Sequence, residues 1–256
     1  MTGGNNVTIN FYRIMGFYDA NRETSINDVY VGANASVYAK LMRNVYVWMA
    51  GALAVTGLTA AYVAKHLDWV YAIAQNQLFF WGIMIAELVL VFTLSARIMK
   101  MSFATAGLMF IAYSVLNGVT FSFLFLAYSM QSIASTFFVT AGTFGTMALI
   151  GATTKRDLSK LGNIAFMALI GLIIATVVNI FLHSTMLMWI TTYAGVLIFV
   201  ALTAYDSQKI KKMLMMYGTE VNESTQKLAL LGSLSLYLDF INLFIYLLRI
   251  FGGNRN

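Results

Sequence analysis

Two aspartates, Asp206 and Asp239, lie at or inside apolar stretches long enough to cross a membrane. Asp239 is the extreme case, because the 24-residue apolar run 228–251 around it contains no other acid. A lone carboxylate in lipid costs on the order of several kcal/mol, so it persists only with a partner or a function. Two such acids in neighbouring segments indicate a shared proton, a bound cation or carboxylate catalysis.

The last apolar stretch also carries a polar stripe. Its members recur at intervals of 3, 4, 3, 4 and 3 residues, which places them on one face of a helix: Gly232, Ser235, Asp239, Asn242, Tyr246 and Arg249. Such a stripe either hydrogen-bonds neighbouring helices or lines an ion or proton path. Hydrogen bonding between helices does not require a carboxylate, so we expect a central helix with Ser235, Asp239, Asn242 and Tyr246 on an ion pathway.

Glu87 is a further acid inside an apolar stretch, and we assign it to the same pathway. Arg97 closes the end of that stretch, roughly 15 Å away along a helix axis, which is too far for a direct pair. Two interpretations of Arg97 stay open. It is an interfacial anchor, or it is a counter-ion to an aspartate.

Composition defines the elements that hold these residues. The chain is 60% hydrophobic and 10% charged, against about 25% charged residues in soluble domains. We therefore predict an all-α polytopic membrane protein with seven transmembrane helices and the seventh at the centre. The predicted spans are 45–64, 78–96, 103–128, 133–153, 161–182, 186–204 and 228–251. Residues 1–40 form a polar cytoplasmic tail, and 41–256 the transmembrane domain.

The basic residues predict the orientation. Thirteen of them fall in the N-terminal tail or in alternate linkers: Arg13, Arg22, Lys40, Arg43, Arg97, Lys100, Lys155, Arg156, Lys160, Lys209, Lys211, Lys212 and Lys227. Three fall on the other side: Lys65, Arg249 and Arg255. The positive-inside rule then places the N-terminus in the cytoplasm and the C-terminus outside, provided that the seventh segment spans rather than re-enters.

Several kinds of site are excluded or disfavoured. The chain has no cysteine, and its two histidines, His66 and His183, lie far apart in predicted loops, so a Cys or His metal site is not expected. The net charge of +6 is divided among short loops, which does not indicate a nucleic-acid partner. We expect no resident cofactor. The chain also has no proline, so helix breaks must come from glycine or polar residues.

Two segments, ALTAYDSQKIK at 201–211 and SLYLDFINLF at 235–244, resemble the Bax inhibitor-1 family of transmembrane Bax inhibitor motif proteins. The likeness covers about residues 40–252, and the compact loops suggest a bacterial-type member in the plasma (inner) membrane. The likeness implies a seven-helix fold with the last helix central, and a pH-sensitive Ca²⁺ leak governed by a hydrogen-bonded aspartate pair. By motif these aspartates are Asp206 and Asp239. Glu87 and Arg97 match an acid and an arginine associated with the pathway in bacterial relatives.

The residue types suit that chemistry. Ca²⁺ binds about six to eight oxygen ligands, so Asp206, Asp239 and Glu87 are candidate transient ligands, too few for a tight cage. Two nearby carboxylates cannot both ionise cheaply, so they share a proton and titrate as one unit. Arg97 offers a competing salt bridge. We therefore expect Asp206, Asp239 and Arg97 to sense pH and gate the leak.

An intramembrane protease is one alternative to the leak. Tyr205-Asp206 resembles half of the aspartyl intramembrane protease signature, but those enzymes also need Gly-x-Gly-Asp and Pro-Ala-Leu segments. Asp239 follows Leu236-Tyr-Leu238 and the chain has no proline, so we do not expect an enzyme. Two alternatives stay open: a non-transporting modulator of a membrane protease or of a stress or cell-death pathway, and a proton-coupled transporter of another solute.

Overall fold

A computed structural model describes residues 35–218 and 220–253, and seven of its helices are long and apolar enough to cross a membrane. These are α3 (Ala35–Lys65), α5 (Gln77–Arg97), α6 (Phe103–Phe121), α8 (Met130–Thr153), α9 (Ser159–Leu182), α10 (Thr185–Tyr217) and α11 (Glu223–Phe251). Three short helices join them: α4 (Leu67–Gln75), η1 (Ile98–Lys100) and α7 (Leu124–Ala127). The predicted all-α fold with seven spans is confirmed.

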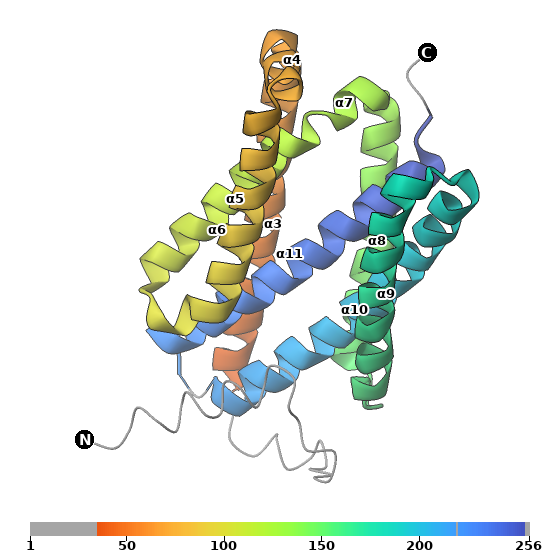
Figure 1. Cartoon of the computed structure of the whole chain (residues 1–256). Helices are drawn as coiled ribbons and strands as arrows, with labels where there is room; N and C mark the ends of the chain where they lie inside the picture. The colour runs from red at the N-terminus through yellow and green to blue at the C-terminus, as the bar shows by residue number, and fades with distance from the viewer. Residues whose placement is uncertain (1–34, 219, 254–256) are drawn as a thin grey trace.

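Helix α11 lies at the centre of the bundle (Figure 1). In its most apolar 18-residue window 72% of the residues are buried, against 6–33% in the other six spans. On one side α11 packs against α3 and α6, and on the other against α8 and α10. The protein is therefore two groups of three helices, α3–α5–α6 and α8–α9–α10, with α11 between them.

Several boundaries differ from those predicted by hydropathy. Helix α10 continues thirteen residues beyond Ala204, because its buried Ile210, Met213 and Leu214 keep helical spacing through a lysine-rich segment. Helix α3 begins at Ala35, inside the predicted tail, and residues 1–34 of that tail lie outside the described residues. Helix α4 occupies a connection that we expected to be a loop.

The third span is interrupted near its end by a polar residue. Helix α6 stops at Phe121, and the Ser122 hydroxyl donates to the backbone oxygen of Val119 at 2.6 Å. A short α7 then completes the span. This break fits the expectation that, without proline, helices are interrupted at polar or glycine positions.

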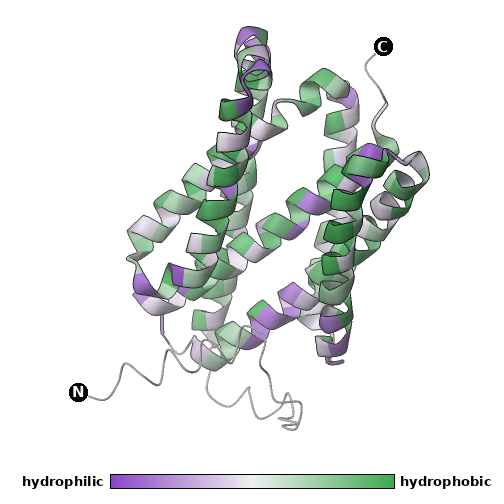
Figure 2. Ribbon diagram, viewed as in Figure 1, coloured by the Kyte–Doolittle hydropathy of each residue, from purple (hydrophilic) through white to green (hydrophobic). Residues whose placement is uncertain are grey.

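Basic side chains gather at one end of the bundle. Of thirteen Lys and Arg residues in the described part, eleven lie at the end where α3 begins and α10 finishes: Lys40, Arg43, Arg97, Lys100, Lys155, Arg156, Lys160, Lys209, Lys211, Lys212 and Lys227. Only Lys65 and Arg249 of the described basic residues lie toward the opposite end. Figure 2 shows mainly apolar helix surfaces between the two ends, with polar positions in the middle of α11. We call the lysine-rich end the basic end.

Close packing between α3 and α6 depends on Gly118. A Cβ atom there would lie 2.7 Å from the backbone oxygen of Thr56 and 2.5 Å from the Cβ of Thr59. Gly142 of α8, in contrast, has no neighbouring atom within 4 Å of such a Cβ.

We predict that Gly118→Ala destabilises the protein by about 1–3 kcal/mol, because the backbone of α3 must move away. The control Gly142→Ala should be neutral or stabilising by up to about 1 kcal/mol, since alanine favours the helix and meets open space. Thermal unfolding of the detergent-solubilised protein measures both. Equal transition temperatures would show that α3 and α6 are less tightly packed than described.

Candidate functional site

The two predicted aspartates face each other across the α10–α11 seam. Two glycines set the register of these antiparallel helices: Gly232 packs against Ile210, and Gly195 packs against the ring of Tyr246. This register places Asp206 about one helical turn, roughly 5 Å, closer to the basic end than Asp239. The apolar stretches alone place Asp206 just past the end of its span and Asp239 well inside its own, which suggests a larger difference in depth between the two. The extension of α10 to Tyr217 removes that difficulty.

Asp239 is buried and incompletely satisfied. Its side chain is 5% exposed, and no described residue donates a hydrogen bond to its Oδ2. Asp206 is half-buried and near enough to interact with it electrostatically. The seam therefore holds two carboxylates close together with an open acceptor on the deeper one.

Lys209 supplies the positive charge beside the pair. It interacts electrostatically with both Asp206 and Asp239, and its Nζ lies 5.8 Å from the centre of the Tyr205 ring. From the sequence, Lys209 is only one of the basic residues of the cytoplasmic side. Its position three residues after Asp206, on the same helical face, was the available signal.

Arg97 and Glu87 lie apart from this seam. Arg97 ends α5, is exposed, and pairs with no acid among the described residues. Glu87 is half-buried and accepts a 2.6 Å hydrogen bond from the hydroxyl of Thr120 on α6. The structure thus brings Asp206 and Asp239 together, and places neither Arg97 nor Glu87 with them.

A second buried polar cluster lies on the opposite face of α11 and was missed by the sequence analysis. The fully buried Tyr237 hydroxyl lies 2.7 Å from Thr56 Oγ1, which donates to the Ser114 carbonyl oxygen at 3.0 Å. Because Thr56 has one hydroxyl hydrogen, Tyr237 is the donor to Thr56. Glu87 lies close enough to interact electrostatically with Tyr237. This cluster joins α11 to α3 and α6.

The rest of the polar stripe follows α11 toward the end opposite the basic end. Asn242 donates to the carbonyl oxygen of Leu238 in its own helix at 2.8 Å. Tyr246 stacks on Phe199 with ring centres 5.9 Å apart. The exposed Arg249 guanidinium lies 5.6 Å from the centre of the Tyr246 ring. The stripe therefore runs from the aspartate seam to the surface near the end of α11.

Side chains from α10 hold the α8–α9 connection at the basic end. The Gln208 amide donates to the Arg156 carbonyl oxygen at 2.8 Å and accepts from the Leu158 amide at 2.9 Å. Lys212 pairs with Asp157 at 2.7 Å. Partial burial opposes the charge of Asp157, but the hydrogen bonds from Lys212 and Ser159 prevail, so the pKa of Asp157 lies below its ordinary value.

The start of α11 holds the α5–α6 turn in a similar way. Lys227 donates to the Met101 carbonyl oxygen at 3.1 Å and lies 3.6 Å from Glu223. Glu223 in turn accepts from the Phe103 amide at 3.0 Å. Together, the α10 and α11 side chains form two clamps, and the one on α10 begins two residues from Asp206.

Comparison with known proteins identifies the family. The family model described as "Inhibitor of apoptosis-promoting Bax1" matches residues 38–256. The chain belongs to the Bax inhibitor-1 family. Three relatives illustrate its range. The inner membrane protein YbhL of Escherichia coli is 50% identical over 214 residues, which are 84% of this chain and 92% of that protein.

Relatives of lower identity occur in other bacteria. A protein of Rickettsia prowazekii is 41% identical over 217 residues, covering 85% of this chain and 91% of its own. A membrane protein of Streptococcus pyogenes serotype M1 is 42% identical over 184 residues, or 72% and 79% of the two chains. With seven apolar helices, these likenesses show that this family member is a multi-pass membrane protein.

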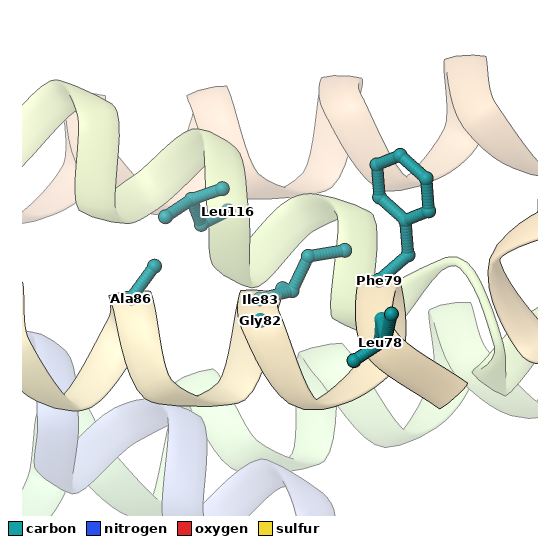
Figure 3. Close-up of a pocket in the computed structure, with 6 residues that line it drawn as sticks. All are labelled: Leu78, Phe79, Gly82, Ile83, Ala86 and Leu116. Carbon is teal, nitrogen blue, oxygen red and sulfur yellow. The ribbon is translucent and has the colours of Figure 1, made fainter. Parts of the chain in front are cut away.

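The acids of this Bax inhibitor-1 family member do not form a preassembled metal cage. Within 35–218 and 220–253, no three His, Cys, Asp or Glu side chains gather as metal ligands. A hollow of about 290 Å³ on the bundle surface is apolar, and no acid lines it (Figure 3). It is lined by Leu78, Phe79, Gly82, Ile83, Ala86 and Leu116. The described residues therefore bring no more than two of the three predicted acids together.

Proposed function

We propose that this protein is a pH-sensitive Ca²⁺ leak channel gated by Asp206 and Asp239. The observation that carries the proposal is the buried Asp239 carboxylate on the central helix, with one oxygen unpartnered and a second aspartate nearby. Such a group is costly in a membrane unless a proton, a cation or water meets it. Membership of the Bax inhibitor-1 family supports the same function.

A proton shared by the pair explains how pH acts. When the two carboxyl groups share one proton, that proton forms a hydrogen bond between them, and Asp239 Oδ2 gains the partner that it lacks. With both ionised, they repel each other and offer four oxygens to a cation. Lys209 opposes this repulsion in the present conformation. We assign Arg97 to the gate as a charge that reaches the pair only after rearrangement.

The ion pathway follows the polar stripe. Ser235, Asp239, Asn242 and Tyr246 provide hydroxyl, carboxylate and amide oxygens, the ligand types that Ca²⁺ prefers. Because no cage exists among the described residues, binding is transient, which suits a leak. Glu87 contributes a further negative charge from the opposite side of α11.

Two further assignments complete the proposal. We place the protein in the inner membrane of a bacterium, as the printed name of the Escherichia coli relative suggests. The basic end then faces the cytoplasm, and α11 carries the chain to the outside. The second candidate function, modulation of a membrane protease or of a stress or cell-death pathway without transport, draws on the family description.

The first prediction concerns flux. Purified protein in liposomes should conduct Ca²⁺, and Asp239→Asn should lower the rate at least about tenfold, equivalent to about 1.4 kcal/mol, because the mid-membrane charge is lost. Glu87→Gln should lower it less, by about threefold, through the weaker local attraction for cations. The exposed Asp68→Asn is the matched control and should leave the rate unchanged. Wild-type flux equal to that of empty liposomes would favour the non-transporting alternative.

The second prediction concerns the pair. Flux should change with pH between about 5 and 8, and Asp206→Asn and Asp239→Asn should each abolish that response because one shared proton requires both residues. The double variant should add little. Flux measured across a pH series tests this. Additive effects of the two substitutions would show that the aspartates work separately.

The third prediction concerns orientation. Alkaline phosphatase fused after Asn256 should be active, because the enzyme matures only outside the cytoplasm and α11 ends opposite the basic end. The same fusion placed after Tyr217, at the basic end, is the control and should be inactive. An inactive fusion at Asn256 would mean that the last segment returns to the cytoplasm.

A further inference from the structure

The central helix is open along one narrow stripe. From Leu228 to Leu248 every residue is buried except six, and these recur on one helical face: Leu231, Ser235, Leu238, Asn242, Ile245 and Tyr246. Residues at intervals of three and four lie on the same face of a helix, so the accessible residues mark a single face of α11. We call this accessible face of α11 the slot.

The slot lies between α3 and α10. On one side α10 packs against α11 through Gly195 and Gly232. On the other side α3 packs against it around Thr56. The two flanking helices meet at the basic end, where Leu41 lies against Gly218. Figure 1 shows that the two helices diverge toward the other end.

Two polar groups in and beside the slot have no hydrogen-bond partner among the described residues. Ser233 and Thr203 donate to the carbonyl oxygens of Ala229 and Phe199 in their own helices, at 2.8 and 2.7 Å. Ser235, two residues from Ser233, makes no hydrogen bond with any described residue, and the Oδ2 of the buried Asp239, beside the slot, has no donor. Lipid tails or a dry helix contact would leave both groups unsatisfied.

We propose that the slot is filled with water and gives hydrated cations a lateral entry to Asp239. Ser235 and Asn242 then exchange hydrogen bonds with that water, and Asp239 receives the donor it lacks. The role of the slot in cation entry rests on the Ca²⁺ leak proposed above. The presence of water in it does not, and the two can be tested separately.

Cysteine accessibility tests the slot directly, because the natural chain contains no cysteine. Full-length Ser235→Cys, Leu238→Cys and Asn242→Cys proteins in liposomes are exposed on both sides to a charged trimethylammonium methanethiosulfonate. The controls are Ser233→Cys, which is fully buried on the same helix, and Leu197→Cys, which is 71% exposed on α10. A count of thiols in denaturant verifies that each cysteine is present.

We expect the slot cysteines to react at least about tenfold faster than both controls, because the reagent attacks the thiolate, which forms only in water. Slot rates equal to that of Leu197→Cys would mean that lipid fills the slot and would overturn the proposal. Dimers cross-linked through Ser235→Cys would overturn it as well, because a second copy would then cover the slot. If one variant fails to fold, the other two slot positions decide.

The outcomes also separate the slot from the leak. Fast labelling without Ca²⁺ flux retains the water-filled slot and rejects the proposed channel. Ca²⁺ flux without labelling of the slot cysteines retains the proposed channel and rejects the water-filled slot, so cations would reach Asp239 by another route. Protection of Asn242→Cys by millimolar Ca²⁺, with no change at an exposed cysteine outside the slot such as Asp68→Cys on α4, would place the cation in the slot itself.

Discussion

A carboxylate in the middle of a membrane constrains everything around it. Asp239 can persist only on a helix that other helices shield from lipid, and α11 is the most buried span of the described chain. That requirement explains why two groups of three helices surround a single central one. It also explains the glycines at 195 and 232, because close approach of α10 is what brings Asp206 to the pair.

Much of this arrangement could be predicted from sequence, because it depends on periodicity. The intervals of three and four residues in 232–249 are enough to predict one polar face and a central position. The depth of Asp206 could not be predicted in the same way. The apolar stretch ends at Ala204, whereas the helix continues to Tyr217 because Ile210, Met213 and Leu214 are buried against other helices.

Tertiary geometry accounts for what sequence reasoning missed. Lys209 appeared to be one more basic residue of a cytoplasmic linker, and only the register of α10 against α11 places it beside the aspartates. Tyr237 lay outside the polar stripe, and its hydrogen bond to Thr56 depends on the close approach of α3. The slot depends on where α3 and α10 pack against α11, which no local pattern encodes.

The two clamps at the basic end have a mechanical consequence. Gln208 and Lys212 tie the α8–α9 connection to α10, whereas Glu223 and Lys227 tie the α5–α6 turn to α11. The connection between α8 and α9 is therefore attached to α10, which carries Asp206, and the turn between α5 and α6 is attached to α11, which carries Asp239. Any shift of α10 against α11 that follows a change of charge at the seam would therefore have to move the attached connections as well, or break these contacts.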